Sequence, residues 1–124
     1  TVWGDGSPIR DFIYSEDVAD GMIEVVKQGY NKPINLGSGA GVTIKEIATS
    51  ISNKMPDKCE IVWDTSKPAG DKKRIMNTNR AESIGIKPKT SLDKGIDSTI
   101  KWYNKHNAKN SGRYNAFKDK LYTS

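Results

Sequence analysis

The sequence predicts a domain of the α/β class, in which short strands alternate with about four helices. Three observations predict this class. Apolar residues recur at helical spacing in several segments, helix-capping residues stand just before those segments, and short apolar runs lie between them. The length of 124 residues suits one domain, and 35% hydrophobic with 28% charged residues is typical of a globular protein.

The chain is expected to begin with two extended segments joined by a turn. Asp5-Gly6 is a strong turn signal, because Asp and Gly readily adopt the backbone angles that tight turns require. The apolar run Val2-Trp3 precedes this turn, and a short extended segment over residues 9–14 follows it.

A first helix is expected from Ser15 to about Lys27. Ser15 is predicted to cap its N-terminus, and the acidic pair Glu16-Asp17 suits the positive end of the helix dipole. Gly29 is expected to end the helix. The predicted apolar face consists of Val18, Met22, Val25 and Val26.

A buried strand and a second helix are expected next. Residues 33–37 form a short apolar run that closes with a glycine, which is typical of a buried strand. Thr43 and Glu46 have the spacing of a capping box, so a helix should begin here, and Pro56 stands just past its end. The predicted apolar face consists of Ile44, Ile47, Ala48 and Ile51.

The C-terminal half is expected to add a strand over residues 59–63 and two helices. Asn79 opens a second apparent capping box, and the short helix that it begins should stop at Gly85. Ser91 is predicted to cap the last helix, which should extend to about residue 105. Its apolar face consists of Leu92, Ile96, Ile100 and Tyr103, with Trp102 beside it.

The single cysteine, Cys59, cannot form an internal disulfide, which favours a reducing, cytoplasmic location. We expect Cys59 to pack in the strand that it adjoins. The only histidine, His106, lies far away in the sequence, so neither a Cys-His nucleophile nor a zinc site is predicted. No apolar run is long enough to suggest a membrane helix.

Most of the net charge of +5 lies near the C-terminus. Five cationic residues against Asp119 give +4 over residues 105–124. A solvated basic polar tail over residues 108–124 is the simpler interpretation. Nucleic-acid binding by this tail is the alternative, for which Tyr114 and Phe117 are the only further indication. The five cationic residues are Lys105, Lys109, Arg113, Lys118 and Lys120.

The spacing Gly37-x-Gly39-x-Gly41 after a predicted strand invites a dinucleotide-binding interpretation. The motif for such a site would require a third glycine at the position of Val42, so the signal is weak. A tight connection between a strand and a helix is the preferred interpretation.

The stretch T-S-K-P-A-G-D-K-K-R, residues 65–74, concentrates positive charge around a proline and a glycine. Arginine can grip phosphate oxygens with two parallel hydrogen bonds, and lysine supplies a point charge. Arg10 adds a further guanidinium at the start of an extended segment. A phosphorylated ligand and an ordinary solvated loop both remain open from the residues alone, which contain no evident reaction centre.

Four segments resemble the extended short-chain dehydrogenase/reductases that act on nucleotide sugars. The first two are V-W-G-D-G-S-P-I-R-D-F-I-Y-S-E-D-V-A and N-L-G-S-G-A-G-V-T-I-K-E-I. The third, W-D-T-S-K-P-A-G-D-K-K-R-I-M-N-T-N-R-A, is similar to a stretch of the GDP-L-fucose synthases, and I-G-I-K-P-K-T-S-L-D-K-G-I-D-S-T-I-K-W-Y is similar to the closing segment. One departure is Tyr14, where the fucose synthases often have histidine.

The resemblance implies that residues 1–107 are the C-terminal substrate-binding region of a Rossmann-type enzyme. The family binds NADP or NAD mainly through an N-terminal half that also carries a catalytic Tyr-x-x-x-Lys pair. The only match to that pair here runs from Tyr114 to Lys118, beyond the region of resemblance, and is read as chance. No catalytic residue is therefore assigned, and the chain alone is expected to be inactive.

The resemblance also assigns substrate-binding roles. Arg10 matches the arginine that contacts the nucleotide diphosphate, and Arg74 matches a basic position that contacts the GDP-sugar. Trp3 matches an aromatic residue near the sugar, with core packing as its alternative. Lys67 and Asp71 match positions that line the nucleotide site, where the Asp71 carboxylate could accept hydrogen bonds from sugar hydroxyls.

The implied whole enzyme is an NAD(P)-dependent epimerase/reductase of the GDP-L-fucose synthase type. Its reaction is the 3,5-epimerisation and 4-reduction of GDP-4-keto-6-deoxy-D-mannose, and its expected state is a cytoplasmic homodimer. Another nucleotide-sugar 4-epimerase or dehydratase of the same superfamily is one alternative. A non-catalytic binding module is the other.

Overall fold

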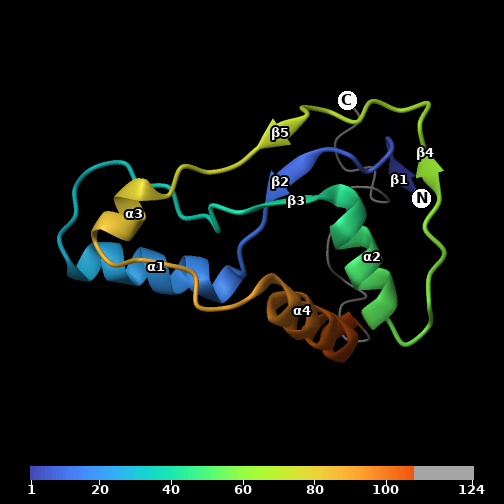
Figure 1. Cartoon of the computed structure of the whole chain (residues 1–124). Helices are drawn as coiled ribbons and strands as arrows, with labels where there is room; N and C mark the ends of the chain where they lie inside the picture. Colours follow the sequence, from blue (N-terminus) through green and yellow to red (C-terminus); the bar gives the residue numbers. More distant parts are fainter. Residues whose placement is uncertain (108–124) are drawn as a thin grey trace, which may run out of the picture.

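A computed structural model of the chain describes residues 1–107 (Figure 1). It confirms the α/β class, with four helices among the described residues. The helices are α1 (Ser15–Lys27), α2 (Ile44–Lys54), α3 (Asn79–Ser83) and α4 (Leu92–Asn107). The strands are β1 (Val2–Trp3), β2 (Ile9–Asp11), β3 (Gly41–Thr43), β4 (Trp63–Asp64) and β5 (Lys73–Arg74). The predicted tail, residues 108–124, lies outside the described residues.

The strands form two small sheets. β1 pairs with β4 in parallel, while β2 lies at the centre of a three-stranded sheet of order β3-β2-β5. β2 is antiparallel to β3 and parallel to β5. In Figure 1, α1 and α3 lie at one end of this sheet, and α2 and α4 lie below the other end.

The predicted turn at Asp5-Gly6 forms, but it does not make a hairpin. The Asp5 carboxylate accepts hydrogen bonds from the Ser7 amide (2.9 Å) and hydroxyl (2.7 Å). The strands on its two sides, β1 and β2, belong to different sheets. The turn therefore moves the chain from one sheet to the other.

The first helix has the predicted length but a different N-cap and a different buried face. Tyr14 is the N-cap residue and makes no side-chain capping bond, so the prediction of a Ser15 cap is wrong. Met22 and Val26 are 60% and 79% exposed. The inward side of α1 carries Gly21, the one buried residue of the helix.

The start of α2 confirms the capping box. The Glu46 amide donates to Thr43 Oγ1 (3.1 Å), and the Thr43 amide donates to the Glu46 carboxylate (2.7 Å). The helix ends at Lys54, before Pro56, as predicted. A hydrogen-bonded cap satisfies amides that a helix N-terminus otherwise leaves without partners.

Replacing Thr43 with alanine should lower the free energy of unfolding by about 1 kcal/mol, because the Glu46 amide loses its acceptor. Urea denaturation of the chain would measure the loss. Thr49→Ala, an exposed change inside the same helix, is the matched control and should be neutral or slightly stabilising, since alanine favours helices. Equal losses in the two variants would contradict the role of the cap.

Two predicted strands are wrong or shorter than expected. Residues 33–37 form no strand, and Asn35 instead donates its side-chain amide to the Asn77 carbonyl (3.1 Å). Of the strand predicted over residues 59–63, only residue Trp63 lies in β4. Cys59 is exposed, so the prediction that it packs in a strand is also wrong.

The last two helices begin close to their predicted starts. The N-cap of α3 is Thr78 rather than Asn79, and the Thr78 hydroxyl donates to the Glu82 carboxylate (2.6 Å). The Lys94 amide contacts the Ser91 hydroxyl at 3.4 Å, in agreement with a cap at Ser91. The α4 helix continues to residue 107, slightly beyond the expected end.

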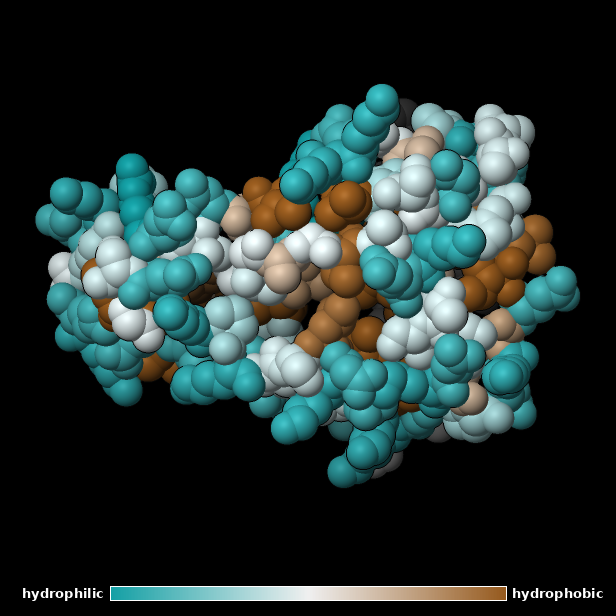
Figure 2. Space-filling model, in the orientation of Figure 1, coloured by the Kyte–Doolittle hydropathy of each residue, from teal (hydrophilic) through white to brown (hydrophobic). Residues whose placement is uncertain are grey.

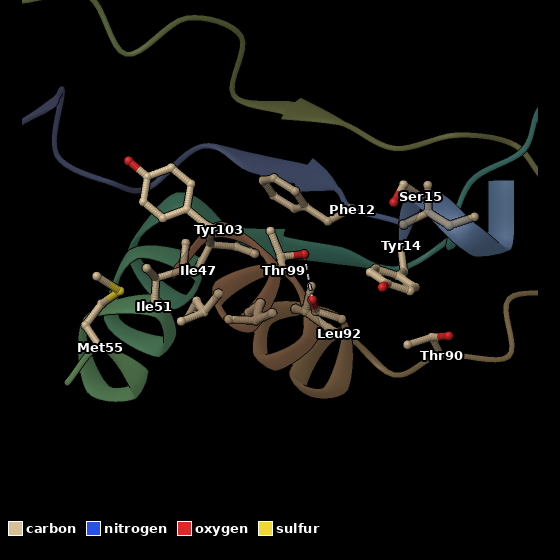
Figure 3. A pocket seen from close by; sticks show the side chains of 14 residues that line it. Phe12, Tyr14, Ser15, Ile47, Ile51, Met55, Thr90, Leu92, Thr99 and Tyr103 are labelled. Atoms are coloured by element: carbon tan, nitrogen blue, oxygen red, sulfur yellow. Dashed lines mark hydrogen bonds between the residues drawn. The ribbon is translucent and has the colours of Figure 1, made fainter. Parts of the chain in front are cut away.

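The core of the described residues is small. Ala81 and Ile96 are its only buried hydrophobic side chains. Figure 2 shows apolar residues reaching the surface in patches between hydrophilic ones. An apolar hollow of about 610 Å³ lies between α2 and α4, beneath the end of β2 (Figure 3). Within residues 1–107, no helix has both the length and the apolar character that crossing a membrane demands.

Candidate ligand-binding site

Arg10 and Arg74 are direct neighbours in the three-stranded sheet. Arg10 lies at the middle of β2, Arg74 at the end of β5, and the two residues are register partners in the parallel pairing. Partners in a sheet present their side chains on the same face. The sheet therefore brings together two guanidinium groups that are 64 positions apart in the sequence.

Asp71 joins the two arginines. Arg10 Nη1 donates to the Asp71 carbonyl oxygen (2.7 Å) and to the Ile9 carbonyl oxygen (2.8 Å). Arg74 Nη2 forms an ion pair with Asp71 Oδ2 at 2.5 Å. Arg10 is half-buried, whereas the Arg74 side chain is 76% exposed. Both arginines keep further N–H groups that these bonds do not use.

The loop over residues 65–72 returns across the N-terminal strand. Its start is a turn in which the Asp64 carboxylate accepts from the Ser66 amide (3.1 Å) and the Lys67 amide donates to the Asp64 carbonyl (3.3 Å). Farther along, Ala69 lies so close to Gly4 that a Cβ at Gly4 would be 2.8 Å from the Ala69 Cβ. Gly4 also has φ +81°, which disfavours any other residue there.

The structure groups three of the five predicted site residues. Arg10 and Arg74 each bond to Asp71, whereas Lys67 and Trp3 are exposed and have no side-chain hydrogen bond to this group among the described residues. Trp3 is 65% exposed, so it does not pack in the core of residues 1–107. Its strand partner is Asp64, at the start of the loop, which places Trp3 at the loop's edge.

The glycine-rich loop over residues 37–41 does not fit a dinucleotide. The amides of Ser38 (2.8 Å) and Gly39 (3.0 Å) already donate to the Asp11 carboxylate. A phosphate would need these same amides, and the carboxylate would repel it. The described residues therefore provide no phosphate cradle for NAD or NADP at this loop. The loop is not the predicted connection from a strand to a helix either, because residues 33–37 form no strand and β3 comes before α2.

Sequence reasoning missed Asp11. Its carboxylate accepts four hydrogen bonds, from Ser38 N and Oγ, Gly39 N and Met76 N. Partial burial raises the pKa of the Asp11 carboxyl, but the hydrogen bonds from Ser38, Met76 and Gly39 outweigh burial, so the pKa lies below its ordinary value. The only sequence feature that could have pointed to Asp11 was its position directly after Arg10, a predicted site residue.

The lowered pKa of Asp11 predicts an acid-sensitive contribution to stability. A carboxyl whose folded pKa is depressed stabilises the fold above its unfolded pKa of about 3.9 and loses that contribution as the pH falls toward the folded pKa. Urea denaturation between pH 6 and pH 3 should show wild type more stable than Asp11→Asn at the upper end. The difference should shrink below about pH 4. A stability difference between the two proteins that stays constant with pH would contradict the contribution of the ionised Asp11 carboxylate.

The apolar hollow is separate from the arginine group. Figure 3 shows Ile47 and Ile51 of α2, and Met55 just after it, facing Leu92 and other side chains of α4 across the hollow. Phe12 lies above them in Figure 3. None of the five predicted site residues lines it. The charged site lies instead at β2 and β5, on the surface of the sheet.

Comparison with known proteins agrees with the α/β fold. The model of the NAD dependent epimerase/dehydratase family matches residues 1–37. A GDP-L-fucose synthase from Sinorhizobium fredii is 40% identical over 97 residues, which are 77% of this chain and 31% of that protein. The chain thus spans about a third of the length of the curated relatives that it matches.

Two solved structures share the fold. A GDP-L-fucose synthetase from Naegleria fowleri bound to NADP has a TM-score of 0.78 at 25% identity, over 86% of this chain and 35% of that one. A UDP-glucose 4-epimerase from Thermotoga maritima with UDP-glucose has a TM-score of 0.71 at 26% identity, over 84% of this chain and 34% of that one.

These findings identify the chain as part of an extended short-chain dehydrogenase/reductase of the Rossmann type. The first 37 residues match the NAD dependent epimerase/dehydratase family, and the chain as a whole is similar to the C-terminal portion of such enzymes. Within the family it is similar to the GDP-L-fucose synthases.

Proposed function

We propose that the chain is the nucleotide-sugar-binding portion of an NAD(P)-dependent epimerase/reductase, with a GDP-sugar as its ligand. The observation that carries the proposal is the pairing of Arg10 with Arg74 in one sheet, with Asp71 between them. Two adjacent guanidinium groups match the two phosphates of a nucleoside diphosphate, because each can donate two parallel hydrogen bonds.

The remaining predicted residues would add further contacts to the ligand. Lys67 would add a positive charge at the loop, and the exposed Trp3 ring would offer an apolar face to the sugar. The Asp71 carboxylate holds Arg74 and has a second oxygen that could accept from a hydroxyl of the ligand. In the whole enzyme these contacts would hold the sugar for proton and hydride transfer by groups outside this chain.

Calorimetric titration of the chain with GDP, UDP and dTDP tests the proposal. We expect GDP to bind at least about tenfold more tightly than UDP, which is a difference of about 1.4 kcal/mol. The same titration with GDP-mannose would measure the binding of a GDP-sugar. Failure of all three nucleotides to bind would overturn the proposal.

A second candidate is a nucleotide-sugar 4-epimerase or dehydratase that uses another base. The similarity in fold to the UDP-glucose 4-epimerase supports it. Tighter binding of UDP or dTDP than of GDP would favour this alternative, and the same titration therefore separates the two candidates.

We further propose that the GDP-sugar reaction is the 3,5-epimerisation and 4-reduction of GDP-4-keto-6-deoxy-D-mannose, as in the fucose synthases. The nicotinamide cofactor, NADP or NAD, would bind mainly to a part of the enzyme outside this chain. The chain alone should then show no NADPH-dependent reduction, and any such turnover would contradict this assignment. A cytoplasmic homodimer stays a prediction.

A further inference from the structure

We propose that Asp11 is a positioning residue for the Arg10–Arg74 pair. Its carboxylate binds the end of β2 to residues 38–39 and to the segment after β5. This attachment keeps the two guanidinium groups side by side. This inference rests on the proposed function. It concerns Asp11, to which the sequence analysis assigned no role. The four hydrogen bonds of its carboxylate go to Ser38, Gly39 and Met76, and none goes to an arginine side chain.

The contacts of Asp11 join three distant segments. Oδ1 accepts from the Ser38 amide (2.8 Å) and hydroxyl (2.5 Å), and Oδ2 accepts from Gly39 N (3.0 Å) and Met76 N (3.1 Å). Ser38 and Met76 are 27 and 65 positions away in the sequence. One half-buried side chain therefore holds together parts of the chain that have no local reason to meet.

The position of Arg74 depends on a short strand pairing. β2 and β5 share only two register pairs, Ile9 with Lys73 and Arg10 with Arg74. Such a short pairing is weak without further support. On one side it is supported by the bond from Arg10 to Asp71, and on the other by the bond from Met76 to Asp11. Loss of the second support would free the end of β5 that carries Arg74.

The packing around Asp11 requires a glycine at residue 37. A Cβ at Gly37 would lie 2.7 Å from the Met76 Cβ and 3.0 Å from Asp11 Oδ2. Contacts this short would push Met76 or the carboxylate aside. The sequence thus leaves space for the carboxylate and the segment after β5 to approach each other.

Asp5 provides a matched control. Like Asp11, it accepts hydrogen bonds from the amide and the hydroxyl of one serine, Ser7. These bonds close a local turn and join no distant segments. Asp5→Asn therefore makes the same chemical change at a carboxylate of similar chemistry, without affecting the attachment of β5.

A double-mutant cycle measured by titration with GDP tests the positioning role. Asp11→Asn should weaken GDP binding about tenfold in the wild-type background but twofold or less in an Arg74→Ala background, because coupled residues give non-additive effects. Asp5→Asn should change the affinity less than twofold. A tenfold loss in both backgrounds, or no loss in either, would overturn the inference.

Amide hydrogen exchange gives a readout that needs no ligand. In Asp11→Asn, the amides of Met76, Gly39 and Ile9 should exchange faster, while those of α2 should keep their wild-type rates. Unchanged exchange at Met76 and Ile9 would overturn the inference. If wild type binds no GDP, the proposed function fails, and the exchange rates still decide whether Asp11 fastens β5.

A milder variant covers the case in which Asp11→Asn does not fold. Ser38→Ala removes one side-chain donor to Asp11 and leaves the carboxylate in place. It should weaken GDP binding about threefold, again only when Arg74 is present. An equal loss in the Arg74→Ala background would count against the inference.

Discussion

Replacing Arg10 with alanine is expected to weaken GDP binding by the chain about ten- to a hundredfold. A hydrogen bond to a charged group contributes about 1.5–3 kcal/mol, and each 1.4 kcal/mol is a factor of ten in affinity. Arg10 also fixes the loop through the Asp71 carbonyl, so its loss removes both a phosphate donor and an anchor of the site. Calorimetric titration of the two proteins would measure the change.

Two further variants sharpen this result. Arg10→Lys keeps the charge but loses the planar fork, so its affinity should fall between wild type and Arg10→Ala. Arg80→Ala removes the same charge at a distance from the site, on α3, where its guanidinium donates to the Pro33 carbonyl. A similar loss in Arg80→Ala would show that GDP responds only to net charge, and would count against a specific site at Arg10.

Replacing Ile96 with alanine is expected to lower the free energy of unfolding by about 2–5 kcal/mol, because it leaves a cavity at a buried position. Ile96 is 9% exposed and lies in α4, which packs on α2. It is one of two buried hydrophobic residues among residues 1–107, so little other core remains to compensate. Urea denaturation followed by circular dichroism would measure the loss.

The control for this change is Ile23→Ala in α1, since Ile23 is 54% exposed and loses the same atoms. Its cost should stay below about 1 kcal/mol, as is usual for changes outside the core. A loss at Ile23 as large as the loss at Ile96 would mean that the outer face of α1 is covered by another part of the protein under the conditions of the measurement.

The helices were predictable because their signals are local. Thr43 and Glu46 are three residues apart and form both bonds of the capping box, so a few neighbouring residues contain the information for the start of α2. The end of α1 near Gly29 follows a similarly local rule. The prediction of a cap at Ser15 was wrong because a serine before a helical pattern does not by itself determine which residue is the N-cap.

The strands were less predictable because pairing depends on distant partners. Residues 33–37 have the composition of a buried strand, but they find no strand partner and are held instead by side-chain bonds such as that from Asn35 to Asn77. β5 has two exposed, charged residues and no strand signal, yet it pairs with β2. A segment becomes a strand only where a neighbouring segment can form backbone hydrogen bonds with it, and the local sequence pattern does not reveal that neighbour.

The sequence by itself determined the α/β class, the starts of α2 and α4, and, through resemblance to a family, the arginines proposed to bind a diphosphate. Only the tertiary structure decided that Arg10 and Arg74 are register partners, that Asp71 joins them and that Trp3 is exposed. It also decided the role of Asp11, whose bonds span 27 and 65 positions. Helix signals act within one turn, whereas these contacts exist only once the folded chain has brought distant segments together.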